Sequence, residues 1–262
     1  GLGAAGGILE VFMQQPTVSW KNALQEGRPI TFNPLVLYRG VWINAATIMP
    51  ITCSQFAVSR ALELQILKDG ATNLTDAQKI GCAAMGGCAS SLFSCPAELT
   101  ILQQQKTGDT LGTTLRRITS QYGVTSLYRS IGCTAIREGV YSVGYLGVCP
   151  IIQSRLAEVE ALKDKPYTTW ILGAFSAGLM GAVCSHPFDT IKTRMQGNLE
   201  TSTSNEYRHF SGAARAVYNE GQMFAGMVPR GLRILGATII LSTFKEQAGG
   251  WLERSREQSS SE

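Results

Sequence analysis

Apolar residues dominate six stretches of this chain, and each stretch is long enough for a helix that crosses a membrane. None is apolar throughout, because charged residues such as Glu10, Glu98 and Asp189 interrupt them. Charged groups are tolerated within a membrane mainly where they face a polar interior. The pattern therefore predicts six transmembrane helices around a water-accessible cavity, over residues 1–24, 41–64, 77–105, 131–154, 167–195 and 228–248.

The six helices are expected to form three hairpins, each with a polar connection between its two members. The second and third connections contain TLRRITSQYG (114–123) and SGAARAVYNEG (211–221), which have the periodicity of short amphipathic helices. The first connection is shorter, with 22 residues from Pro16 to Tyr38 against 32 from Pro96 to Tyr128. We expect it to have lost most of its helix.

A short sequence recurs once in each hairpin. It reads PTVSWKNALQ from Pro16, PAELTILQQQ from Pro96 and PFDTIKTRMQ from Pro187, and these prolines should kink their helices. Since the prolines lie 80 and 91 residues apart, the chain is one unit written three times. The predicted repeats are 1–66, 77–156 and 166–250, followed by a polar tail over 251–262.

We name the three copies of this short sequence the proline windows. The third window, from Pro187, fits the pattern Pro-x-acid-x-x-base-x-base in full, through Asp189, Lys192 and Arg194. It resembles the signature of the mitochondrial carrier family, and the resemblance extends along the whole chain. It implies a single all-α carrier domain (1–262) in which six transmembrane helices form three hairpins related by a pseudo-threefold axis, with short helices on the matrix side. It also implies a multi-pass protein of the inner mitochondrial membrane, with both termini towards the intermembrane space.

Composition agrees with a membrane protein and argues against other classes. Hydrophobic residues make up 44% of the chain, charged residues only 16%, and the 28 glycines suit close helix packing in lipid. The net charge of +4 is mild and does not require a nucleic-acid partner. The seven cysteines form no CxxC pair, so we interpret them as small buried residues rather than metal ligands. No catalytic triad, phosphate loop or dinucleotide fingerprint is present, which argues against an enzyme and against a cofactor.

The resemblance also implies three substrate contact points, each nine residues after an aromatic residue that precedes an even-numbered helix, namely Tyr38, Tyr128 or Phe224. They fall on Thr47 with Ile48, on Arg137 with Glu138, and on Arg233. An arginine beside an acid at the second point resembles the carriers of amino acids, so Glu138 would take an ammonium group while the arginines take a carboxylate. The alternative is a purely structural ion pair. The triple-arginine, triple-methionine run of the nucleotide carriers is absent.

In carriers, the acid of each proline window pairs with the base of the next and closes a gate on the matrix side. The resemblance implies two such pairs here, Glu98 with Lys192 and Asp189 with Lys21, and a bridging glutamine at Gln103. The third pair would be Val18 with Ile101. Both members are apolar, which is expected if the two positions touch, because the loss of one partner alone would strand a buried charge.

Carriers have a second ring of acid–base pairs on the cytoplasmic side, and in this chain the ring positions no longer form the expected pairs. Its expected acids fall on Arg60, Pro150 and Glu246, and its expected bases on Glu63, Gln153 and Gly249. We therefore expect a molecule that closes only on the matrix side, although alternating access requires two closed states of comparable free energy.

A second family marker, an aromatic residue followed by a base and glycine, precedes each even-numbered helix. It reads Tyr38-Arg39-Gly40, then Tyr128-Arg129-Ser130, then Phe224-Ala225-Gly226. The resemblance implies that Arg39, Gly40, Tyr128 and Arg129 hold cardiolipin phosphates at helix N-termini. The alternative is a set of aromatic anchors at the membrane interface.

Two functions fit these observations. The first is a solute carrier that exchanges a small zwitterion or carboxylate, such as an amino acid, as an antiporter. The second is a carrier fold that no longer transports and serves as a structural or lipid-binding subunit of a larger inner-membrane complex, such as a respiratory-complex accessory subunit. The residues at the three contact points favour the first, and the shortened first connection and missing cytoplasmic ring favour the second.

Overall fold

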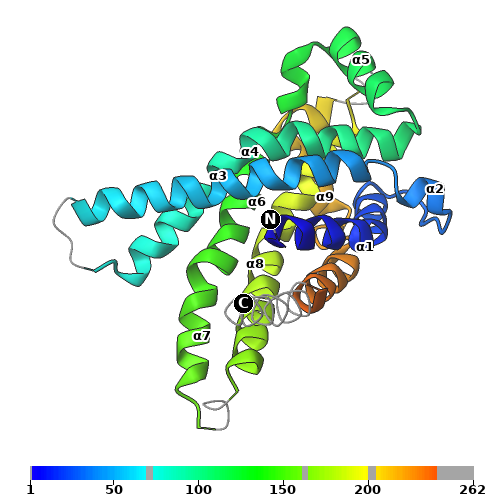
Figure 1. The fold of residues 1–262 in the computed structure, drawn as a ribbon. Helices are drawn as coiled ribbons and strands as arrows, with labels where there is room; N and C mark the ends of the chain where they lie inside the picture. Colours follow the sequence, from blue (N-terminus) through cyan, green and yellow to red (C-terminus); the bar gives the residue numbers. More distant parts are fainter. Residues whose placement is uncertain (1, 69–72, 161–164, 200–204, 241–262) are drawn as a thin grey trace, which may run out of the picture.

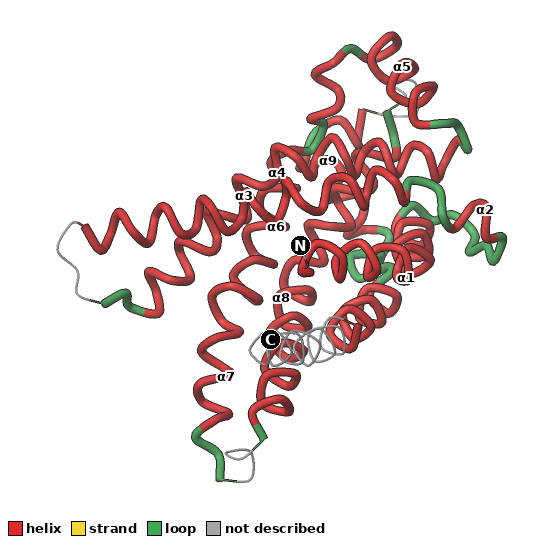
Figure 2. The backbone as a smooth tube through the Cα atoms, viewed as in Figure 1, coloured by secondary structure: helices red, strands yellow, loops and turns green. Residues whose placement is uncertain are grey.

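The structure is a computed structural model that describes residues 2–68, 73–160, 165–199 and 205–240. Helices dominate this part of the chain, and no strand occurs in it (Figure 2). The all-α membrane fold predicted from the sequence is thus confirmed.

The helices follow the predicted order of three hairpins. The first hairpin consists of α1 (Leu2–Gln25), α2 (Pro34–Leu37) and α3 (Val41–Lys68). The second consists of α4 (Asp76–Thr107), α5 (Leu111–Tyr122), the 3₁₀ turn η1 (Val124–Tyr128), α6 (Ile131–Ser142), the π-helix η2 (Val143–Val148) and α7 (Cys149–Ala157). The third consists of α8 (Pro166–Gly197), η3 (Asn205–Arg208), α9 (Phe210–Asn219) and a helical segment over 227–240.

Three helices in the described part of the chain are long and apolar enough to cross a membrane, within Pro34–Lys68, Asp76–Thr107 and Thr168–Gly197. The four-residue helix α2 stands in the first connection, where α5 and α9 stand in the other two. Residues 241–248 of the predicted sixth helix lie outside the described residues, as does the predicted tail. The repeat boundaries stay a prediction.

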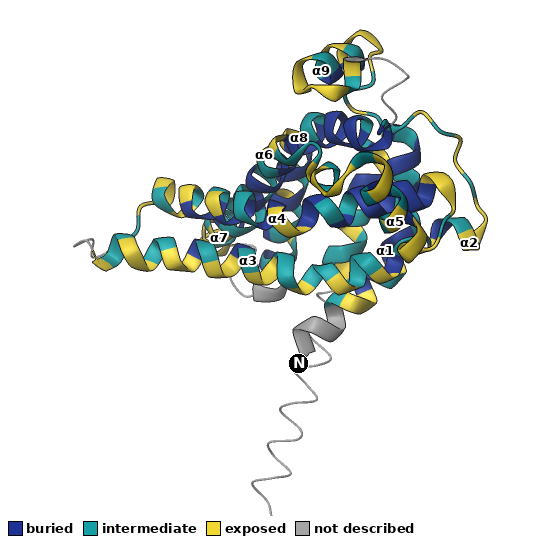
Figure 3. Cartoon of the chain, turned by 90° about the horizontal axis from the view of Figure 1, so that it is seen from above, coloured by how far each residue is buried: buried dark blue, intermediate teal, exposed yellow. Residues whose placement is uncertain are grey.

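The three window prolines lie inside α1, α4 and α8, and each helix continues through its proline. The parts of these helices from the prolines onward, residues 16–26, 96–107 and 187–197, are named the proline end here. Two long pairs, α3 with α4 and α7 with α8, extend from the centre of the molecule in different directions (Figure 1). Burial is densest where the helices meet, whereas α3 has a largely exposed outer side (Figure 3).

Small residues allow the helix backbones to approach closely around the centre. A Cβ atom on Gly87 of α4 would lie 2.4 Å from the carbonyl oxygen of Glu138, which shows that α4 and α6 are in backbone contact there. In the π-helix, a Cβ atom on Gly144 would lie 2.8 Å from the carbonyl oxygen of Ala177 in α8. The predicted span 131–154 is therefore not one regular helix. It is interrupted by a π-turn, a feature that is frequent at functional sites.

Candidate functional site

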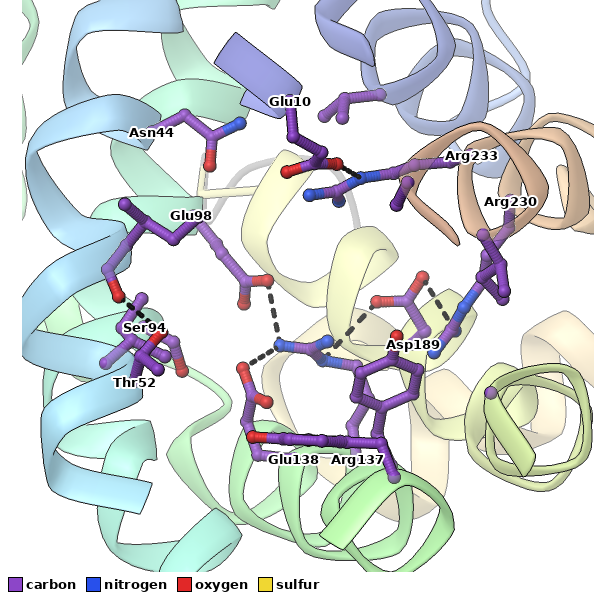
Figure 4. Close-up of a pocket in the computed structure, with 18 of the residues that line it drawn as sticks. Glu10, Asn44, Thr52, Ser94, Glu98, Arg137, Glu138, Asp189, Arg230 and Arg233 are labelled. Atoms are coloured by element: carbon purple, nitrogen blue, oxygen red, sulfur yellow. Dashed lines mark hydrogen bonds and ion pairs between the residues drawn. The ribbon is translucent and has the colours of Figure 1, made fainter. Parts of the chain in front are cut away.

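A cavity of about 500 Å³ lies between the helices, and all three hairpins contribute to its walls. All the predicted contact residues line it: Thr47, Ile48, Arg137, Glu138 and Arg233. Its charged lining is balanced, with four acids (Glu10, Glu98, Glu138, Asp189) and four bases (Lys21, Arg137, Arg230, Arg233). Figure 4 shows most of these charged groups directed towards one another around the cavity.

Asp189 is the centre of the charged network at the proline end. Its side chain is almost fully buried, and Oδ2 accepts hydrogen bonds from Lys21 Nζ at 2.9 Å and from Gln25 Nε2 at 3.0 Å. Three more cations face it at longer distances: Arg230 and Lys192 at 3.4 Å and Arg137 at 3.5 Å. Asp189 thus joins the first and third hairpins, as predicted for the Asp189–Lys21 pair.

Glu98 joins the second hairpin to the third. Lys192 Nζ lies 2.7 Å from Glu98 Oε2, the other ion pair that the sequence predicts. Gln103 also connects the second and third hairpins. Its side-chain amide donates to the backbone carbonyl of Gln196 at 2.8 Å, and its side-chain carbonyl accepts from Arg117 at 3.2 Å. The predicted gate residues are therefore together, while their action as a gate stays a prediction.

Arg137 lies in the middle of this network and already has carboxylate partners. Its Nη2 donates to Glu98 at 2.8 Å and to Glu138 at 2.6 Å, and its Nε faces Asp189 at 3.5 Å. The arginine and all three acids line the cavity (Figure 4). A solute carboxylate would have to displace Glu98 or Glu138 to bind Nη2 of Arg137.

Glu138 is held from a second side. Gln55 of α3 donates to its Oε2 at 3.4 Å and to the hydroxyl of Ser90 at 3.2 Å, and the Tyr145 hydroxyl donates to the Gln55 carbonyl. Tyr145 belongs to the π-helix, so this turn directs a phenol into the wall of the cavity. The sequence contact points did not include Gln55 or Tyr145, because their roles depend on the π-turn and on the packing of α3 against α4.

Arg233 lies apart from the Arg137 network and faces Glu10 of α1. The Nε–Oε1 distance is 3.7 Å, which is an ion pair but too long for a hydrogen bond. The Arg233 side chain is 39% exposed, whereas the Glu10 side chain is 8% exposed. Sequence reasoning placed Arg233 at a contact point but did not assign Glu10, although an acid in an apolar helix was a visible signal.

Arg230 and His186 were also missed. Arg230 donates to Ser185 at 2.7 Å and lies 3.4 Å from the His186 Nδ1, while the other ring nitrogen of His186 is 2.9 Å from the carbonyl oxygen of Ala225. The His186 ring stacks on Phe224, with centroids 5.9 Å apart. These contacts hold Arg230 next to Asp189 and attach α8 to the segment before the last helix.

The seam between the first and second hairpins has neutral contacts in place of an ion pair. Val18 and Ile101 both line the cavity, and their direct contact stays a prediction. Deeper in the proline end, Asn22 donates to the side-chain carbonyl of Gln105 at 2.8 Å, and the Gln105 amide donates to the backbone carbonyl of Arg39 at 3.4 Å. Amide hydrogen bonds thus close the position where the family pattern has a third salt bridge.

Glu26 and Arg28 form a pair directly after α1, and Arg28 also reaches the carbonyl of Gln105. Burial raises the pKa of the Glu26 carboxyl above its usual range, although Arg28 acts in the opposite direction. Lys106 of α4 donates to the carbonyl of Gly197 at 2.7 Å. The ends of α1, α4 and α8 are therefore tied together beyond the charged network.

At the other end of the cavity, the described ring positions make only contacts within their own hairpin or with the adjoining helix. Arg60 pairs with Glu63 one turn away in α3 at 2.9 Å, and Gln153 donates to the carbonyl of Trp170 at 3.2 Å. The predicted position of Glu246 lies outside the described residues. The imbalance expected from the sequence is thus present among the ring positions that the structure describes.

The aromatic markers share one backbone feature. Gly40, Ser130 and Gly226 each precede a helix, and their φ angles are +82°, +70° and +79°. Glycine adopts this left-handed conformation without strain, whereas a serine such as Ser130 is strained in it. Arg129 donates to the carbonyls of Leu199 and Tyr207, and Tyr128 lines an apolar pocket of about 330 Å³ that also contains Ser130. Lipid binding by these residues stays a prediction.

Comparison with known proteins identifies one family. The family model described as "Mitochondrial carrier protein" matches residues 73–159 and 163–256, which are the second and third hairpins. A probable S-adenosylmethionine carrier 2 of Arabidopsis thaliana is 26% identical over 228 residues, which cover 84% of this chain and 64% of the relative. The chain therefore spans less than two thirds of the length of that relative.

Two further relatives carry other solutes in their names. Mitochondrial glutamate carrier 2 of Rattus norvegicus is 25% identical over 231 residues, covering 77% of this chain and 71% of the relative. Mitochondrial 2-oxodicarboxylate carrier 2 of Saccharomyces cerevisiae is 25% identical over 218 residues, covering 79% of this chain and 70% of the relative.

Proposed function

Because this chain belongs to the mitochondrial carrier family, we propose that it transports a small solute across the inner mitochondrial membrane by alternating access. The proposed solute is a zwitterion or carboxylate, with an amino acid as the preferred class. In this proposal the proline end faces the matrix, and both termini face the intermembrane space.

The observation that supports transport best is a charged cavity closed at one end. Both acids and bases line it, and the network around Asp189 and Glu98 ties all three hairpins together below it. Charged side chains inside a membrane are costly unless they serve a pathway or a ligand. A fold with only a structural role could have replaced such groups with apolar ones.

The relatives support the solute class. The three named above are carriers of S-adenosylmethionine, glutamate and 2-oxodicarboxylates by their names. All three solutes contain carboxylate groups, and the first two also contain an α-ammonium group. A cavity with both signs of charge suits such molecules, because each charged group of the solute finds an opposite charge on the wall.

The test is uptake by proteoliposomes that contain the purified chain and are loaded with unlabelled solute. We expect exchange of at least one amino acid or dicarboxylate, and we expect Glu138→Gln to abolish it, because the amide removes the negative charge that faces Arg137 at 2.6 Å in the cavity wall. Glu158→Gln is the matched control, since that side chain is exposed at the end of α7. Absence of exchange by the unmodified protein would refute transport.

The second candidate is a carrier fold that serves as a subunit of a larger inner-membrane assembly. The observation in its favour is the ring opposite the proline end, where Arg60 and Glu63 pair within one helix instead of across the cavity. Purification in a mild detergent separates the two candidates. Co-migration with other subunits, together with no exchange by the isolated chain, would favour the structural role.

Cardiolipin is the proposed bound lipid. The left-handed residues Gly40 and Ser130 lie directly before the N-termini of α3 and α6, where a phosphate would be favoured. Native mass measurement of the purified protein should detect bound cardiolipin, and Arg39→Gln should reduce the bound fraction. Equal retention by the variant would contradict a role for Arg39.

A further inference from the structure

The charged groups around the cavity fall into two sets that differ in how well they are already bonded. Asp189, Glu98, Arg137 and Glu138 form hydrogen bonds or close ion pairs with each other and with lysines. Glu10 and Arg233 form the other set, and their mutual distance of 3.7 Å exceeds a hydrogen bond. Figure 4 shows this pair separate from the Arg137 cluster, with both side chains towards the cavity.

We infer that Glu10 and Arg233 are the primary binding groups for an α-amino acid, with the solute ammonium on Glu10 and its carboxylate on Arg233. This inference rests on the proposed transport function and makes it more specific. It assigns a role to Glu10, on the first span, and it moves the site from the Arg137–Glu138 pair to the opposite wall of the cavity.

The bonding of the arginines supports this choice. Arg137 already faces three carboxylates, at 2.6, 2.8 and 3.5 Å. Arg233 faces one, at 3.7 Å, and its side chain is 39% exposed. A guanidinium group can bind a carboxylate with two parallel hydrogen bonds. Of these two arginines, Arg233 can do so without first losing a protein partner of comparable strength, whereas Arg137 cannot.

The state of Glu10 points in the same direction. Only 8% of its side chain is exposed, and it lies in a helix of the predicted membrane span. Its charged partner among the described residues is Arg233 alone, at a distance beyond hydrogen bonding. A carboxylate in such a position is costly unless a ligand completes its bonding. An ammonium group would supply the missing donors.

Neighbouring contacts hold the pair in place. Gln14 lies one turn after Glu10 and donates its amide to the backbone carbonyl of Arg233 at 2.9 Å. Gly236, one turn after Arg233, leaves space for this amide, because a Cβ atom there would lie 2.1 Å from Gln14 Nε2. The first and last spans are thus fixed in register where the two charged groups meet.

The charge balance favours a zwitterion over a dicarboxylate. The lining has four acids and four bases, and Lys192, buried behind the wall, adds one positive charge. An amino acid with zero or one net negative charge leaves this balance nearly unchanged. A dicarboxylate bound at Arg233 would place its second carboxylate near Glu10, where like charges repel.

The experiment compares each amino acid with the analogue that lacks the ammonium group, namely alanine with propionate and glutamate with glutarate. Uptake into proteoliposomes is measured for the unmodified chain, Glu10→Gln, Glu10→Asp and the exposed control Glu158→Gln. We expect the unmodified chain to prefer the amino acid, and Glu10→Gln to reduce this preference by about tenfold or more, the scale for one charge-assisted hydrogen bond. Glu10→Asp should retain most of the preference, because it keeps the charge.

Arg233→Gln gives a second readout, since it should weaken uptake of the amino acid and of its analogue alike. An unchanged preference in Glu10→Gln, or uptake of dicarboxylates only, would overturn the inference and leave transport in place. No uptake of any solute by the unmodified chain would overturn transport and the inference together. Thermal unfolding of each variant in detergent shows whether a loss of uptake reflects misfolding.

Discussion

Replacing Asp189 by asparagine should destabilise the molecule more than any other single isosteric change in the charged network. The carboxylate is 1% exposed and accepts from Lys21 at 2.9 Å, while three further cations lie within 3.5 Å. An amide of the same shape removes the negative charge that these four cations share. The surrounding packing is kept, so the loss reports the electrostatic role of the side chain.

The magnitude follows from counting charges. The network contains four cations (Lys21, Arg137, Lys192, Arg230) and three acids (Glu98, Glu138, Asp189), a net charge of +1. Asp189→Asn raises it to +2 inside the protein, and a buried charge without a partner costs ~3–5 kcal/mol. Lys21→Met lowers it to zero and leaves Asp189 three cations, so we expect a loss of ~1–2 kcal/mol. The double variant restores +1 and should cost less than the sum of the two.

The cysteines of the chain provide the assay. Cys82, Cys95, Cys133 and Cys149 are buried and should react with a thiol-reactive dye only on unfolding, whereas Cys53 and Cys184 are exposed from the start. With roughly 2–4 °C of Tm for each kcal/mol, Asp189→Asn should lower the Tm by about 6 °C or more. A smaller fall than that of Lys21→Met, or strictly additive losses in the double variant, would refute the shared-anion reasoning.

Three further changes test local packing by the same thermal assay. Ser130→Gly should raise stability by ~1 kcal/mol, because it relieves a left-handed conformation and removes a buried hydroxyl without a bonding partner; a lower Tm would contradict this. Gly87→Ala should destabilise by ~2 kcal/mol or more, because its Cβ would overlap a backbone carbonyl of α6, whereas Gly81→Ala, with open space around it, should be neutral or slightly stabilising. Val18→Asp alone should cost ~3 kcal/mol and the double change with Ile101→Lys much less; zero coupling in that cycle would mean that the two positions do not touch.

Much of the fold could be predicted from the sequence, because helix length, proline position and repeat spacing are local or periodic signals. The family resemblance is confirmed by a model match over the second and third hairpins. The first hairpin is not matched, and it is also the one with the four-residue α2 in its connection. The windows placed Glu98 opposite Lys192 and Asp189 opposite Lys21 because a threefold repeat fixes which positions face each other.

The remaining site features depend on contacts that a repeat pattern does not encode. The π-turn at Val143–Val148 shifts the register of the fourth span and places the Tyr145 hydroxyl within hydrogen-bonding distance of Gln55. The residue pattern of this span did not predict the shift. Arg230 is held by Ser185 and His186 on another helix. Glu10 was visible as a charge in an apolar stretch, but its partner Arg233 lies 223 residues away, and only the folded chain brings the two together.

The three seams of the proline end therefore differ in physical character. Ion pairs connect the second hairpin to the third and the third to the first, while the seam between the first and second depends on neutral contacts such as Asn22 with Gln105. Separating an ion pair leaves two charges to be hydrated, whereas separating two amides exchanges one hydrogen bond for others with water at a net cost of ~0.5–1.5 kcal/mol. Because these ion pairs are largely buried, salt screens them less than it would screen pairs at the surface. Arg60 and Glu63 pair within α3 instead of across the opposite end, and among the described ring positions there only Gln153 bonds to another hairpin, through one neutral hydrogen bond to the Trp170 carbonyl. Since no ion pair joins two hairpins at these positions, the balance of bonding favours the state that is closed at the proline end.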